Sequence, residues 1–114
     1  MWIRVALDKS AIHSVEDGYT SVFGNEIEEY YFPETVADLL DKDGFLPEMW
    51  ASFDSLIDWG DSDYFPAEKC SSLSVWLENR LQKNLPEPVS EVYGVMLDFC
   101  QKAIKADTGI CFDF

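Results

Sequence analysis

Aspartates and large apolar side chains alternate in DSLIDWGDSDYFP, residues 54 to 66. The carboxylates belong to Asp54, Asp58, Asp61 and Asp63, and the rings next to them to Trp59, Tyr64 and Phe65. Carboxylates at this spacing could bind a metal ion, act as a general acid and base, or face a positively charged protein. The rest of the sequence distinguishes between these three chemistries.

Metal binding needs a ligand spacing that this chain lacks. Residues 41 to 44, DKDG, begin like a calcium loop, but Phe45 occupies the fifth position and Ser52 stands at the twelfth, where a glutamate is required. The aspartates of residues 54 to 66 also lack calcium-loop spacing and a terminal bidentate glutamate. One histidine and three scattered cysteines do not give a zinc pattern. We expect no metal and no other cofactor.

Catalytic motifs are also missing from the sequence. His13, the only histidine, lies in a polar segment with no serine or cysteine motif around it. There is no GxSxG, no glycine-rich phosphate loop and no HExxH. Asp61 and Asp63 could share acid–base work, but carboxylates lie close together by chance in a chain with 22 acidic residues. We therefore predict that the protein is not an enzyme and has no catalytic residues.

The net charge of −14 is concentrated in one half of the chain. Fifteen acidic residues and a single basic one, Lys42, lie between residues 10 and 68, whereas the rest holds seven of each sign. We expect such a chain not to bind nucleic acid directly, because phosphate contacts need Lys and Arg. Segregated negative charge favours a basic protein partner, although it could also serve only to keep one face of the domain hydrated.

The expected compartment is the cytoplasm. The opening MWIRVALDKS has too short an apolar run and no cleavage site for a secretory signal. No apolar run approaches the roughly 18 residues of a membrane span, so we expect no membrane association. The cysteines Cys70, Cys100 and Cys111 form no CxxC pair and are expected to be reduced and buried.

Hydrophobic periodicity predicts a single domain over residues 1–114 with an α+β fold. It is mostly helical, with about four helices packed on a small antiparallel sheet that includes the N- and C-terminal strands. Strands are expected at residues 2–7 and 110–114, and helices at residues 33–44, 46–60, 67–84 and 88–106. Residues 17–32 are expected to be rich in loops, with room for short strands.

The second helix, from 46 to 60, is predicted to turn Leu56 and Ile57 inward. From Asp58 onward the chain is expected to form an exposed turn into the third helix. Most aromatic residues, including Trp50, Trp76 and Phe99, are expected to pack in the core.

An acidic surface with interleaved aromatic rings suits an inhibitor of a basic enzyme. Carboxylates can occupy the places where such an enzyme holds phosphates, and Trp or Tyr can anchor the contact. The predicted interface has one patch within residues 54–65 and a second within residues 26–31. Its members are Asp54, Asp58, Trp59, Asp61, Asp63, Tyr64 and Phe65, together with Glu26, Glu28, Glu29, Tyr30 and Tyr31.

The chain resembles the small immunity proteins that bacteria encode beside polymorphic toxins, including those of contact-dependent growth inhibition systems. The likeness is carried by the short acidic chain, by DWGDSDYFP at residues 58–66 and by the ending KADTGICFDF at residues 105–114. The middle segment is also distantly similar to the acidic, tyrosine-bearing stretch of colicin nuclease immunity proteins. Outside it the chain departs from them, because it is longer and has expected terminal strands.

This resemblance implies a non-enzymatic protein that binds one toxin domain in the cytoplasm of the producing cell and blocks its active site or a nearby surface. The expected partner is a basic toxin domain, with an RNase or DNase as the class that suits an acidic inhibitor, bound as a 1:1 heterodimer. The alternative is an acidic, antitoxin-like or nucleic-acid-mimicking regulator of a basic cellular protein.

Overall fold

The computed structural model describes residues 1–12 and 26–114. The predictions for His13 and for residues 17–25 lie outside these described residues. Four strands, a short 3₁₀ helix and four α-helices follow one another along the described chain. Their bounds are β1 Trp2–Ala6, η1 Lys9–Ala11, β2 Ile27–Tyr31, α2 Glu34–Lys42, α3 Phe45–Phe53, β3 Ser62–Pro66, α4 Ala67–Leu81, α5 Glu87–Ala106 and β4 Gly109–Asp113.

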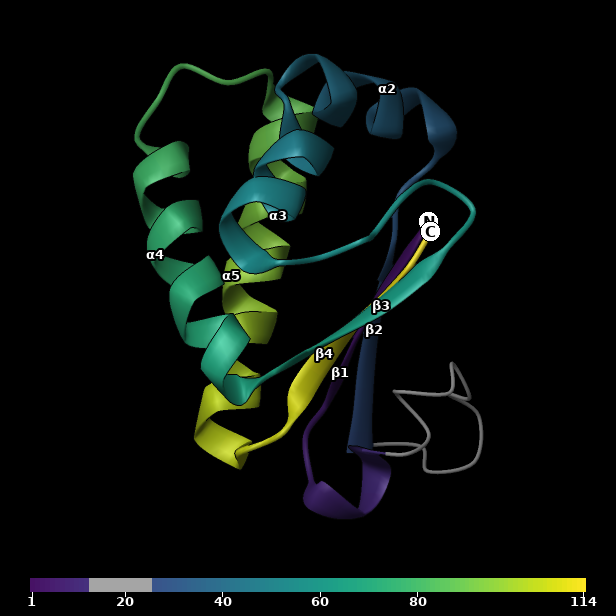
Figure 1. The fold of residues 1–114 in the computed structure, drawn as a ribbon, viewed down its shortest axis with the longest axis vertical. Helices are drawn as coiled ribbons and strands as arrows, with labels where there is room; N and C mark the ends of the chain where they lie inside the picture. The colour runs from purple at the N-terminus through teal and green to yellow at the C-terminus, as the bar shows by residue number, and fades with distance from the viewer. Residues whose placement is uncertain (13–25) are drawn as a thin grey trace.

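The strands form one antiparallel sheet in the order β2-β1-β4-β3. The N- and C-terminal strands β1 and β4 lie side by side in its middle, with Ile3 opposite Phe112. The helices α3, α4 and α5 gather on one side of this sheet (Figure 1). The fold is therefore α+β and mostly helical, with a small antiparallel sheet that includes both terminal strands. This confirms the predicted fold class.

Three helices begin and end close to the predicted residues because the sequence marks their ends. Pro33 directly precedes α2 and Pro88 lies in the first turn of α5, where the fixed φ of proline suits a helix start. Glu34 and Glu87 add negative charge at the positive ends of the same helices. α5 ends at Asp107, which adopts φ 54°, a left-handed conformation that Asp tolerates. None of the helices in the described chain has both the length and the hydrophobicity that a membrane crossing requires.

The core lies between the helices and the inner face of the sheet. α5 contributes seven buried side chains, which include Tyr93, Met96 and Phe99. Phe45 of α3 meets Tyr93 at 6.1 Å and Phe112 of β4 at 6.3 Å between ring centroids. Trp76 also packs against Phe45. Trp76 and Phe99 therefore join the core as predicted.

The predicted helix over residues 46–60 is too long. α3 ends at Phe53 because Asp54 takes the left-handed conformation, φ 50°, and the following amide of Ser55 returns to the carbonyl of Met49. Beyond this stop the helical spacing no longer applies. Ile57 is buried as predicted, but Leu56 is 89% exposed, so the prediction that it faces inward is wrong.

Residues 62 to 66 form an edge strand, β3, where the sequence predicts an exposed turn. Tyr64 lies opposite Cys111 and Phe65 opposite Ile110 in the antiparallel pair with β4. Aspartate and serine are rare in strands, and the pairing partner lies more than 40 residues away along the chain. For these two reasons the local sequence does not reveal this strand.

The side chains of Cys70, Cys100 and Cys111 are all buried, as the sequence predicts. Cys70 of α4 donates its thiol hydrogen to the carbonyl of Phe65, and its contact with Cys100, together with burial, raises the pKa of the Cys100 thiol.

A thiol reagent should leave the folded protein unmodified, because it needs an accessible thiolate. Reaction with an aromatic disulfide reagent should reach three thiols only in denaturant. Rapid native labelling would contradict this burial.

Candidate protein-binding surface

The segment between α3 and β3 carries the exposed aspartates of the first predicted patch. Asp58 and Asp61 frame a tight turn, closed by a 3.1 Å hydrogen bond from the amide of Asp61 to the carbonyl of Asp58. Gly60 supplies the positive φ of 85° that such a turn requires. The Asp58 and Asp61 carboxylates accept hydrogen bonds only from the next backbone amide within the described chain, so both remain open to a partner.

Trp59 fastens this segment to the rest of the molecule. Its indole N–H donates to Asp41 of α2 at 2.7 Å, and its ring lies 4.9 Å from that of Phe114. The amide of Phe114 also donates to the carbonyl of Asp61 at 2.9 Å. Trp59 is therefore half-buried, and much of its ring is used to hold α2, the loop and the C-terminus together.

The end of the first patch is structural. Phe65 is fully buried and packs edge-on against Phe112 at 5.1 Å, so its prediction as a partner contact is wrong. Alternation along β3 turns the Phe65 side chain toward the helices. Asp63 accepts a hydrogen bond from the hydroxyl of Ser55. The ring of Tyr64 lies over Gly109, where an added Cβ would come within 2.5 Å of it.

The second predicted patch follows β2, at the opposite edge of the sheet from β3. The two patches therefore do not form one continuous surface along a sheet edge. Glu28 pairs with Lys102 of α5 at 2.6 Å, and Glu29 pairs with Arg4 of β1 at 3.3 Å. Glu26 accepts a hydrogen bond from the hydroxyl of Ser10. Most of the charge of this patch is thus matched inside the molecule.

The ring of Tyr31 is 52% exposed and lies 5.1 Å from that of Trp2 on the neighbouring strand. Tyr30, by contrast, is half-buried and points toward α5. The tyrosines of the second patch consequently face opposite sides of the sheet.

Ion pairing leaves the negative charge of α2, α3 and the loop after it uncompensated. Among residues 34–68 only Asp43 has a cationic partner within the described chain, namely Arg80. We call the exposed carboxylates of this region the acidic surface. Its members are Glu34, Asp38, Asp41, Glu48, Asp54, Asp58 and Asp61. α2 and the loop lie at the same end of the molecule as both chain termini (Figure 1).

Two exposed apolar side chains lie within this region. Trp50 of α3 is 46% exposed, which contradicts its predicted place in the core, and Leu56 is exposed almost completely. The indole N–H of Trp50 donates to the carbonyl of Ile57 at 2.6 Å, which holds the ring against the loop beside Leu56. Periodicity placed both residues inside. For Leu56 the signal for the contrary was Asp54–Ser55, a pair that favours a helix end.

Asp43 is the one carboxylate of residues 34–68 that forms an ion pair within the described chain. It receives hydrogen bonds from Arg80 of α4 at 2.9 Å and from the hydroxyl of Tyr93 of α5 at 2.6 Å. Burial by itself would raise the pKa of Asp43, but these hydrogen bonds and the charges of Arg80 and Lys83 outweigh it and hold the pKa below its usual value. Asp43 therefore joins three helices and is not available to a partner.

The described residues contain no group of three or more His, Cys, Asp and Glu side chains placed to hold a metal ion. What the surface offers is carboxylates around exposed apolar side chains, a combination that suits contact with a basic protein. No family model, no curated protein and no solved structure matches this chain.

Proposed function

We propose that this chain is an immunity protein that binds and blocks a basic toxin domain, with a nuclease as the toxin class that its charge suits best. The observation that carries the proposal is that the carboxylates of the acidic surface have no Lys or Arg partner within the described residues. Elsewhere in the fold Arg4, Lys102 and Arg80 neutralise carboxylates that are remote in sequence. The seven carboxylates of the acidic surface have no such Lys or Arg in the part of the chain that the structure describes and are exposed to a cationic partner.

The mechanism of such a protein is binding, with no chemical step. The uncompensated charge would accelerate encounter with a basic domain by roughly 10- to 1,000-fold at low salt. Trp50 and Leu56 would then supply the apolar contact that holds the complex, because partly exposed aromatic side chains are favoured anchors. A nuclease covered in this way could no longer bring phosphates to its active site.

Reversing two charges of the acidic surface tests the interface. In Asp58→Lys/Asp61→Lys the fold should be kept, because both side chains make only local hydrogen bonds. Association with the toxin domain should slow by about 10- to 100-fold at low salt, and the difference should shrink as salt is added. Stopped-flow or surface plasmon resonance measures this rate.

The matched control is Glu78→Lys/Glu87→Lys, which changes the net charge by the same amount on exposed positions of α4 and α5. It should slow association much less. Equal slowing by the two double variants would mean that only the total charge matters, and no slowing by either would place the interface elsewhere.

The immunity role is tested in cells. The toxin domain encoded by the gene directly upstream should arrest growth when expressed alone, and co-expression of this chain should restore growth. Arrest that persists, with a stable complex between this chain and a basic cellular protein, would favour the alternative of an acidic regulator.

A further inference from the structure

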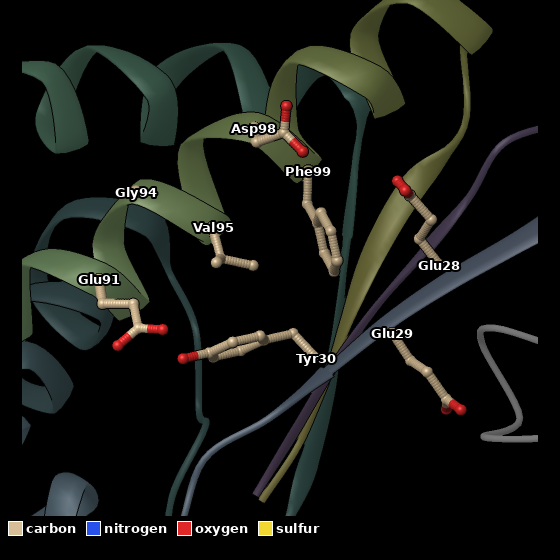
Figure 2. A pocket seen from close by; sticks show the side chains of 8 residues that line it. All are labelled: Glu28, Glu29, Tyr30, Glu91, Gly94, Val95, Asp98 and Phe99. Atoms are coloured by element: carbon tan, nitrogen blue, oxygen red, sulfur yellow. The ribbon is translucent and has the colours of Figure 1, made fainter. Parts of the chain in front are cut away.

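A groove of about 470 Å³ lies between the edge strand β2 and helix α5. Figure 2 shows Tyr30 reaching across it from β2 toward Glu91, while Val95 and Phe99 point into it from α5. Glu29 points away to the other side of the strand. The groove therefore has aromatic and aliphatic walls.

Gly94 keeps part of this groove open. It lies inside the 20-residue helix α5, where glycine costs roughly 0.5–1 kcal/mol relative to alanine. A Cβ at this position would meet no atom within 4 Å, and the φ of Gly94 is not positive. Neither the backbone nor the packing of the chain requires glycine here. The absence of a side chain leaves the helix backbone accessible from the groove.

The two ends of the groove differ in whether their carboxylates have a cationic partner. At one end Lys102 lies 2.6 Å from Glu28 and 2.9 Å from Asp98, so both carboxylates have a cationic partner. At the other end Glu91 has no Lys or Arg partner within the described residues, and it faces the hydroxyl of Tyr30. Burial, and then the charge of Glu91, raise the pKa of Tyr30, so the hydroxyl remains a donor. A net negative charge thus remains beside the Tyr30 ring.

We propose that this groove receives an arginine side chain of the basic partner, with the guanidinium on Glu91 and against the Tyr30 ring. The aliphatic stem would lie over Gly94 and Val95. Arginine fits better than lysine, because its planar fork can bind a carboxylate and stack on an aromatic ring at the same time. The inference rests on the proposed function only in supplying the protein that carries the arginine. The acidic surface would then steer the partner, and the groove would add an anchor to the apolar contact of Trp50 and Leu56.

A short peptide tests the groove without the toxin. Acetyl-Gly-Arg-Gly-amide, titrated into the ¹⁵N-labelled full chain, should shift the amide signals of Tyr30, Glu91 and Gly94 in a saturable manner. The same peptide with citrulline, which has the shape of arginine without its charge, should shift them little. The lysine peptide should bind more weakly than the arginine peptide.

Gly94→Leu fills the groove with a good helix former, and its thermal stability should equal or exceed that of the wild type. It should weaken peptide binding by at least about tenfold, or roughly 1.4 kcal/mol. Gly94→Ala, which adds one methyl group in open space, should bind within about threefold of the wild type. Glu91→Gln, at an exposed position, should lose the preference for arginine over citrulline.

Undiminished peptide binding by Gly94→Leu, or shifts confined to the acidic surface, would overturn the inference. Groove shifts combined with a failure to bind any toxin domain would support the arginine site while overturning the immunity function. Tight toxin binding that Gly94→Leu leaves unchanged would support the immunity function while overturning the arginine site.

Discussion

Replacing Phe65 with alanine is expected to lower the free energy of unfolding by about 3–5 kcal/mol. The ring is fully buried and contacts Phe112 of β4 and Phe53 of α3, so its removal leaves a cavity between the sheet and the helices. Any loss of partner binding by this variant would follow from unfolding. Equilibrium urea denaturation of variant and wild type measures the difference.

Leu56→Ala is the matched control, because this apolar residue comes from the same acidic segment but is 89% exposed. Its stability should stay within about 0.5 kcal/mol of the wild type. Leu56→Ala should instead lower the affinity for the toxin domain, because it removes an apolar contact. A Phe65→Ala variant of wild-type stability that failed to bind would require an accessible ring and would contradict its burial in β3.

This contrast between Phe65 and Leu56 shows where sequence reasoning reaches its limit. α2, α4 and α5 could be predicted because apolar residues recur at helical spacing and a proline lies at the start of each. β3 could not, since its residues favour a turn and only pairing with β4 makes them a strand. Pairing with β4 buries Phe65, whereas the end of α3 at Phe53 leaves Leu56 exposed.

The candidate surface was partly predictable for a related reason. Charge segregation along the chain shows where the acidic residues are concentrated. The sequence could not show which carboxylates are neutralised, because Arg4 and Lys102 lie far along the chain from Glu29 and Glu28. Folding neutralises Glu29 and Glu28 in the second patch. The acidic surface keeps carboxylates without a cationic partner in the described chain.

Asp43→Ala is expected to destabilise the fold by about 3 kcal/mol. The change leaves the Arg80 guanidinium and the buried Tyr93 hydroxyl without their acceptor, and it disconnects the end of α2 from α4 and α5. Asp38→Ala, an exposed and unpaired carboxylate on the same helix, should change stability by less than about 0.5 kcal/mol. Equal effects of the two variants would mean that the Asp43 cluster does not stabilise the fold.

The same cluster predicts a pH dependence whose sign follows from the lowered pKa of Asp43. Because the folded protein holds this carboxyl below its ordinary pKa of 3.8, its contribution to stability is complete well above pH 3.8. The contribution declines as the pH falls below that value and vanishes once the pH passes the folded pKa. The stability gap between wild type and Asp43→Asn should therefore narrow on acidification from pH 6 to pH 3, in urea denaturation at each pH. Acid also relieves the repulsion of the net charge of −14, but it does so in every variant and therefore cancels in the difference. Asp38→Asn is the control, and its stability should stay close to that of the wild type at each pH. A gap for Asp43→Asn that stays constant or widens toward pH 3 would show that the carboxylate is not held ionised by Arg80 and Tyr93.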